Sequence, residues 1–305
     1  MALLRRLLLS RSGIIALLWL ASIVGLHYGQ KRHNELHVDF GETAEVGETL
    51  IPGTALATTV AAMIDHELQH GFGWRPNDFF LWGPRLWADN NANRQLGILQ
   101  TVRETIRVMK DHLTKISSDE FDANLQEADT MFRNDAERLW MPSAESRYRK
   151  GVEHLQEYVR GLQPQLGTSK PINQRHMELL RLFQAWTDLL GDAHANLYRR
   201  EINETRIRPW ETDDLFYRAQ GFAHAMSHCL EALEHDYAPA LEERPILADL
   251  ITEVKQSLNM AAPLKPLVII DDRPAGLFAN HRRNLDSYIT EARQKMYSIR
   301  EELEK

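Results

Sequence analysis

Residues 96–116 read LGILQTVRETIRVMKDHLTKI, and this stretch decides the fold class. Its large apolar residues recur every three or four positions, which places them on one face of an α-helix. They are Leu96, Leu99, Val102, Ile106, Met109, Leu113 and Ile116. Such a stripe stays out of water only when other apolar surfaces cover it, so this helix needs partners.

The same spacing recurs in four other segments of the chain. They are residues 148–162, 173–199, 215–237 and 285–303. Pro142 with Ser143 is typical of a helix start. Ser117 with Glu120 resembles a capping box ahead of a helix through about Arg138. Because several amphipathic helices must cover one another, the sequence predicts an all-α, multi-helix bundle with long connecting loops.

The clearest irregular connection lies around Pro263, Pro266 and Pro274. Within it, residues 267–270 (LVII) are predicted to form a short strand or a buried extended segment. The apolar stripes continue across every candidate boundary. We therefore expect residues 55–305 to form a single helical soluble domain.

An apolar segment without acidic or basic charge occupies residues 13–29. At about 1.5 Å per residue, about 17 residues reach most of the way across a hydrocarbon core of ~30 Å. This predicts an N-terminal transmembrane helix that contacts the lipid bilayer. The flanking basic residues are Arg5, Arg6 and Arg11 before the segment and Lys31 and Arg32 after it. This bias favours a cytoplasmic N-terminus.

Residues 1–30 are thus expected to be a cytoplasmic arm and anchor, and residues 31–54, which are acidic and contain Pro52, a tether. A cleaved signal peptide is the alternative, since it also has a basic start and an apolar core. A signal peptidase needs small residues at two positions before the cut, which the context around residues 23–27 does not offer. The preferred prediction is a single-pass protein of a bacterial inner membrane with its bulk in the periplasm.

The composition excludes several classes of function. A formal net charge of -7 and a pI near 6.0 argue against nucleic-acid binding. Cys229 is the only cysteine, so no intramolecular disulfide can form. The chain also lacks the G-x-S-x-G elbow of hydrolases, the Walker loop and the Rossmann glycine pattern.

The sharpest candidate for chemistry is HELQH, residues 66–70. Residues four apart share one face of a helix, so the imidazoles of His66 and His70 could bind one Zn²⁺. Glu67 would then act as general base on the metal-bound water. A third ligand is missing where the longer motif places it, because position 76 is Pro76. Glu104 is a possible substitute, although nothing in the sequence singles it out.

A second histidine pair and an aromatic segment each allow a functional and a structural interpretation. His224 and His228 also stand four apart and could complete one metal site with the first pair. The preferred interpretation is that they lie at the polar edge of an apolar stripe. Six aromatic residues fall within residues 72–87. The preferred interpretation is that they fill one end of the core. Alternatively, they line a ligand pocket or enter the lipid interface.

Three segments of the sequence are distinctive in combination. They are WETDDLFYRAQG (residues 210–221), GLFANH (residues 276–281) and the stretch from Pro76-Asn77-Asp78 to Gln95-Leu96-Gly97. In these segments the chain resembles an uncharacterised family of Gram-negative bacterial proteins, domain of unknown function 2333. The resemblance implies a short N-terminal arm, one membrane span and a helical domain, and it brings no catalytic or binding residues.

These observations favour a membrane-tethered helical envelope protein with a non-catalytic binding or scaffold role, whose partner is another envelope protein. No catalytic, metal or cofactor residue is assigned in this reading. The alternative is a membrane-anchored, zinc-dependent hydrolase that uses His66, His70 and Glu67. A third reading is a lipid-binding or small-ligand module built on the aromatic residues 72–87.

Overall fold

The computed structural model describes residues 10–32, 45–46, 49–70, 73–77, 89–115, 120–198, 201–202, 205–206, 209–264, 266, 269 and 280–305. The helices are α2 (Arg11–Arg32), α3 (Thr54–Gln69), α5 (Asp89–Val108), the π-helical turn η2 (Met109–Leu113), α6 (Ala123–Phe132), α7 (Ala144–Leu162), α8 (His176–Tyr198), α9 (Pro209–Asp236), α10 (Ala238–Glu242), α11 (Pro245–Ala261) and α12 (His281–Leu303). The predicted all-α class is confirmed.

Two very short antiparallel strand pairs accompany the helices. β1 (Glu45–Val46) pairs with β2 (Thr49–Leu50), with Glu45 opposite Leu50. β3 (Glu201–Ile202) pairs with β4 (Thr205–Arg206), with Glu201 opposite Arg206. Each strand has two residues, so these pairs form no layer of the fold.

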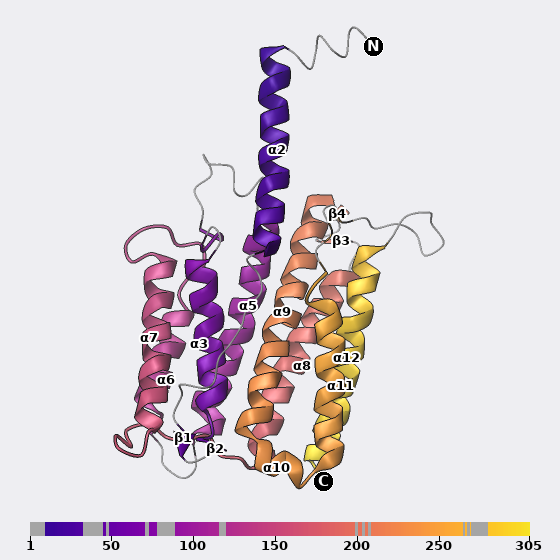
Figure 1. Ribbon diagram of the computed structural model, residues 1–305. Helices are drawn as coiled ribbons and strands as arrows, with labels where there is room; N and C mark the ends of the chain where they lie inside the picture. Colours follow the sequence, from indigo (N-terminus) through magenta and orange to yellow (C-terminus); the bar gives the residue numbers. More distant parts are fainter. Residues whose placement is uncertain are drawn as a thin grey trace.

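The bundle is organised around the pair α5 and α9, which run side by side along its middle. Helices α3, α6 and α7 pack on one side of this pair, and α8, α11 and α12 pack on the other (Figure 1). The buried apolar residues form one cluster that includes both Ala55 and Leu303. The stripe from Leu99 to Leu113 accordingly lies in the core, with Val102 and Ile106 fully buried.

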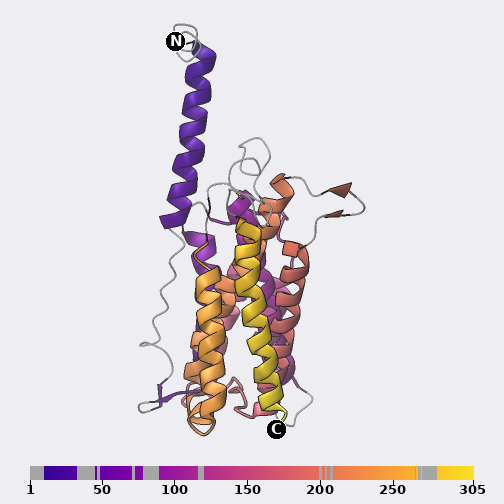
Figure 2. The same cartoon turned by 90° about the vertical axis from the view of Figure 1, so that its right-hand side faces the viewer.

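The bundle has two ends, which we name as they are drawn in Figure 1. The upper end contains the last turn of α3, residues 73–77 and the first turns of α5 and α9. The lower end contains α10 and the first turn of α3, which the last residue of α9 contacts. Helix α2 stands beyond the upper end in both views (Figures 1 and 2).

Helix boundaries were predicted with mixed success. Ser143 caps α7 as expected, because its hydroxyl accepts a hydrogen bond from the backbone N–H of Ser146. The predicted capping box at Ser117 is wrong for α6, where Asp122 accepts from two backbone N–H groups instead. That helix also ends at Phe132, short of Arg138. Ser117 itself and most of the predicted strand at residues 267–270 lie outside the described residues.

The predicted anchor, residues 13–29, lies within α2. Across the part of the chain that the structure describes, no helix combines the length and the apolar character that a membrane span needs. The helical state of this segment is therefore confirmed, and its transmembrane character is not supported by the structure. Of the predicted tether, residues 33–44 and 47–48 lie outside the described residues.

Helix α3 begins without a cap of its own. Its first residue follows Gly53, whose positive φ of 101° suits glycine and whose position provides no side-chain oxygen. Asp236, the last residue of α9, supplies the missing acceptor across the lower end. Its carboxylate oxygens accept hydrogen bonds from the backbone N–H groups of Ala55 at 3.1 Å and Leu56 at 2.8 Å. The two helices are thus joined by a tertiary N-cap.

We expect this cap to make the stability of the fold depend on pH. Burial raises the pKa of Asp236 from 3.8 to about 7, against the lowering effect of the backbone N–H groups that it accepts from. Between about pH 4 and pH 7 the folded state therefore holds a proton that the unfolded state has lost. The free energy of unfolding should fall as pH rises through this window, by up to about 1.4 kcal/mol per pH unit.

The measurement is urea unfolding of the full chain across this window, for the wild type and for Asp236→Asn. The amide cannot ionise, so the wild type should lose stability relative to the variant as pH rises. If both proteins change in parallel between about pH 4.5 and pH 6.5, Asp236 does not titrate in this way.

Candidate functional site

The two histidines of HELQH lie together at the upper end of α3. His66 is in the last turn of the helix, and His70 is the residue that ends it. Their rings stack with centroids 4.5 Å apart and planes 11° from parallel. The expectation that the two imidazoles share one face of a helix is therefore correct.

Glu67 faces the interior of the bundle. Its side chain is 5% exposed, and its Oε1 accepts hydrogen bonds from Nη1 of Arg94 at 2.7 Å and from Nη2 at 2.8 Å. Its Oε2 accepts a hydrogen bond from Nε2 of Gln95 at 3.0 Å. Neighbouring residues are about 100° apart around a helix, so Glu67 and His66 project in different directions from α3. Both carboxylate oxygens are already engaged in the contact between α3 and α5.

Gln95 extends this cluster to the chain that follows α3. Its Nε2 also donates to the backbone oxygen of Gly73 at 3.0 Å, and its Oε1 accepts from the backbone N–H of Arg75 at 2.9 Å. We call Glu67, Arg94 and Gln95 the buried polar triad. This triad fixes the path of the chain as it leaves α3, which is a structural role.

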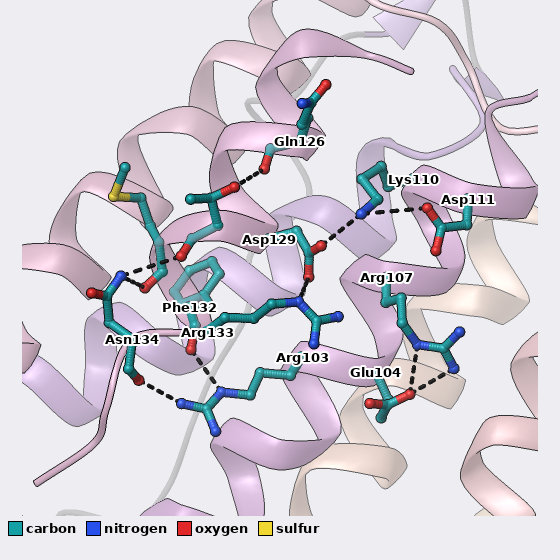
Figure 3. A network of polar contacts seen from close by, with 12 residues as sticks. Arg103, Glu104, Arg107, Lys110, Asp111, Gln126, Asp129, Phe132, Arg133 and Asn134 are labelled. Carbon is teal, nitrogen blue, oxygen red and sulfur yellow. Dashed lines mark hydrogen bonds and ion pairs between the residues drawn. The ribbon is translucent and has the colours of Figure 1, made fainter. Parts of the chain in front are cut away.

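Within the described part of the chain, no third metal ligand accompanies the two histidines. Glu104, the suggested substitute, lies ten residues beyond Arg94 on α5, or about 15 Å farther along that helix. Its carboxylate pairs with Arg107 at 2.7 Å (Figure 3). Among the residues that the structure describes, no three histidine, cysteine, aspartate or glutamate side chains are grouped so as to hold a metal ion.

The second histidine pair lies on α9 beside the first. The rings of His224 and His228 meet edge to face with centroids 4.8 Å apart. Burial lowers the pKa of His228, and the nearby charges of Arg94 and His66 lower it further, whereas Glu231 opposes them. One histidine of each pair, His66 on α3 and His228 on α9, is therefore near enough to the other for their charges to interact. This environment favours neutral His228.

A second polar network joins α5 to α6 (Figure 3). Arg103 donates from Nε to the backbone oxygen of Phe132 at 2.6 Å and from Nη2 to that of Asn134 at 2.7 Å. It thereby satisfies carbonyl groups at the end of α6. Asp129 pairs with Lys110 at 2.7 Å and with Arg133 at 2.8 Å. The network holds α6 against α5 and η2.

Of the six aromatic residues in segment 72–87, only Trp74 lies within the described residues. Trp74 is 3% exposed. Its Nε1 donates to the backbone oxygen of Ala136 at 2.9 Å, and its ring meets that of Tyr148 edge to face at 5.0 Å. Trp74 therefore plugs the upper end of the core, as the preferred reading of the segment expected. The other five aromatic residues lie outside the described part of the chain.

Two of the distinctive sequence segments meet where α5 crosses α9. Gly97, at the end of the segment that starts at Pro76, lies against Gly221, at the end of the segment 210–221. A Cβ atom on Gly97 would come within 2.2 Å of the backbone oxygen of Arg218. Just above this crossing, Nδ2 of Asn93 donates to Oδ1 of Asp214 at 2.6 Å. These segments therefore encode the closest helix contact of the bundle's central pair.

Sequence reasoning missed the residues that surround Glu67. Arg94 and Gln95 were inside one of the distinctive segments, which was the available signal, but they carry no motif of their own. Arg103 and Asp129 gave no signal, because a charged residue between apolar stripe positions usually faces solvent.

Comparison with known proteins agrees with the distinctive segments. No curated protein and no solved structure matches the chain. A family model matches residues 6–191 and 172–305, which together span the chain from the N-terminal arm to the C-terminal residue. The chain therefore belongs to the family described as uncharacterized protein conserved in bacteria (DUF2333).

Proposed function

We propose that the chain is a membrane-tethered helical protein of the bacterial envelope that acts by binding another envelope protein. The observation that carries the tether is the exposure of α2. Ile15, Leu17 and Leu18 are 67%, 47% and 64% exposed on a helix that stands beyond the bundle (Figure 2). Each such side chain gains about 1.5–3 kcal/mol from leaving water, which a bilayer would provide.

The charges around α2 support an orientation for the tether. Arg5, Arg6 and Arg11 precede the apolar segment without an acidic residue among them. Retention of these positive charges in the cytoplasm would place the bundle in the periplasm. In this arrangement the upper end of the bundle is the end nearest the membrane.

The buried polar triad supports a binding role over hydrolysis. A zinc hydrolase of the HELQH type requires the glutamate carboxylate beside the metal-bound water. Here the carboxylate of Glu67 is held by Arg94 and Gln95 on the inner side of α3. To act as a base it would have to break three hydrogen bonds and leave Arg94 as a buried charge without a partner, which is strongly unfavourable.

The tether is tested by fractionation of cells that produce the full chain. We expect the wild type to stay with the membranes after a high-pH carbonate wash. Leu17→Arg combined with Leu18→Arg should release it, because each arginine near the middle of a span costs about 2.5–3.5 kcal/mol. Together the two substitutions cost about 5–7 kcal/mol, so the ratio of free to bound protein should rise on the order of ten-thousandfold.

The matched control is Leu166→Arg, at an exposed position of the loop after α7 (57% exposed). This variant should remain with the membranes. A compartment-sensitive reporter fused to the C-terminus should be active in the periplasm. Recovery of the wild type in the wash would overturn the tether, and reporter activity in the cytoplasm would overturn the orientation.

A further inference from the structure

The loop between α6 and α7 carries an unusual group of exposed apolar side chains. Leu139, Trp140 and Met141 are 36%, 77% and 93% exposed, and we call them the apolar tip. Large apolar side chains in a row on a surface cost free energy in water and mark a contact site. Trp140 is the most informative, because an indole ring is normally buried or placed at an interface.

The loop is fixed to the bundle at its base. Nε1 of Trp74 donates to the backbone oxygen of Ala136, and Nδ2 of Asn77 donates to that of Arg138 at 3.2 Å. The backbone N–H of Ala144 donates to the same oxygen of Arg138 at 2.9 Å. These bonds bracket the apolar tip on both sides along the chain. Hydrogen bonds therefore hold the chain on both sides of the tip, and the exposure of the tip is a fixed feature of the loop.

The apolar tip lies at the upper end of the bundle. Its base contacts residues 73–77, and α7 begins directly after it and runs about 28 Å to the lower end. Helix α2 stands beyond the same upper end (Figures 1 and 2), while the chain enters the bundle through the first turn of α3 at the lower end. Two groups of exposed apolar side chains, one on α2 and one on this loop, thus lie on the same side of the molecule.

We propose that the apolar tip inserts into the interfacial region of the bilayer that holds α2. This inference rests on the proposed tether. Tryptophan prefers the level of the lipid headgroups, where its ring is covered and its N–H stays hydrated. The charged residues just before the tip, Asp135, Glu137 and Arg138, are of both signs. The contact is therefore apolar and does not depend on anionic lipid.

A lipid surface suits the tip better than a protein partner does. A stable protein interface buries about 800 Å² on each side, from about 20–30 residues. Three side chains on a narrow loop provide much less than that. Insertion into lipid needs only a few side chains, because α2 already holds the bundle at the membrane and the second contact is intramolecular.

The test uses single thiol labels on the full chain. Met141→Cys, Leu18→Cys and Leu166→Cys each place a fluorescent probe on an exposed side chain, and the native Cys229 stays unlabelled because it is fully buried and burial raises its pKa. Each labelled protein is reconstituted in phosphatidylcholine vesicles, with and without lipid that carries a nitroxide near the headgroup. Quenching of fluorescence reports that the probe lies in the membrane.

We expect the probes at positions 18 and 141 to lose at least half of their fluorescence and the probe at 166, at the lower end, to lose almost none. Quenching at 18 with none at 141 would overturn the insertion of the tip and leave the tether intact. Quenching at neither position would overturn both proposals. Quenching at 141 alone would support the tip and overturn α2 as the anchor.

Discussion

Replacement of Arg94 by methionine is expected to lower the free energy of unfolding by about 3–5 kcal/mol. The variant leaves the carboxylate of Glu67 buried at 5% exposure, with Gln95 as its one remaining side-chain partner among the described residues. A buried charge without its counter-ion is among the most destabilising changes that one substitution can make. Urea unfolding of the full chain, followed by circular dichroism, measures the loss.

The control is Arg107→Met on the same helix. Arg107 pairs with Glu104 at 2.7 Å, but its side chain is 36% exposed, so its loss should cost less than about 1 kcal/mol. Adding Glu67→Leu to Arg94→Met should recover much of the loss, since no buried charge remains. If Arg94→Met is as stable as Arg107→Met, the triad does not hold the fold and Glu67 is available for another role.

The second large effect is expected at the crossing of α5 and α9. In Gly221→Ala the added Cβ atom would lie 2.2 Å from the backbone oxygen of Arg94, so the two helices must move apart. Overpacking of this kind costs about 1–3 kcal/mol or more. An alanine inside a helix normally adds up to about 1 kcal/mol of stability relative to glycine, so the sign of the effect is reversed here.

Gly191→Ala on α8 is the matched control for this crossing. Its new Cβ atom would lie 3.2 Å from Nη2 of Arg293, a flexible side chain that can shift. This variant should be neutral or slightly more stable than the wild type, by thermal unfolding. Equal losses in Gly191→Ala and Gly221→Ala would show that the crossing is no tighter than an ordinary helix contact.

The apolar spacing predicted the helices because burial alone decides which face of each helix turns inward. Ile106 and Met109 lie in the core for this reason. The end of α6 was less predictable, because Arg103 closes that helix from another element, 29 residues earlier in the chain. A boundary set by a distant side chain leaves no local mark in the sequence.

The candidate site illustrates the same limit. The pattern HELQH correctly placed His66 and His70 on one face, because helix geometry depends only on spacing. The role of Glu67 depends on its partner, and Arg94 is 27 residues away in the sequence. A motif therefore predicts the direction of a side chain better than it predicts what that side chain contacts.

The cap on α3 can form only late in the synthesis of the chain. The carboxylate of Asp236 and the backbone that it caps are 181 residues apart. A ribosome adds about 5–20 residues per second, so roughly 10–35 s pass between synthesis of α3 and synthesis of its cap. Throughout that interval the nascent α3 lacks this stabilising contact.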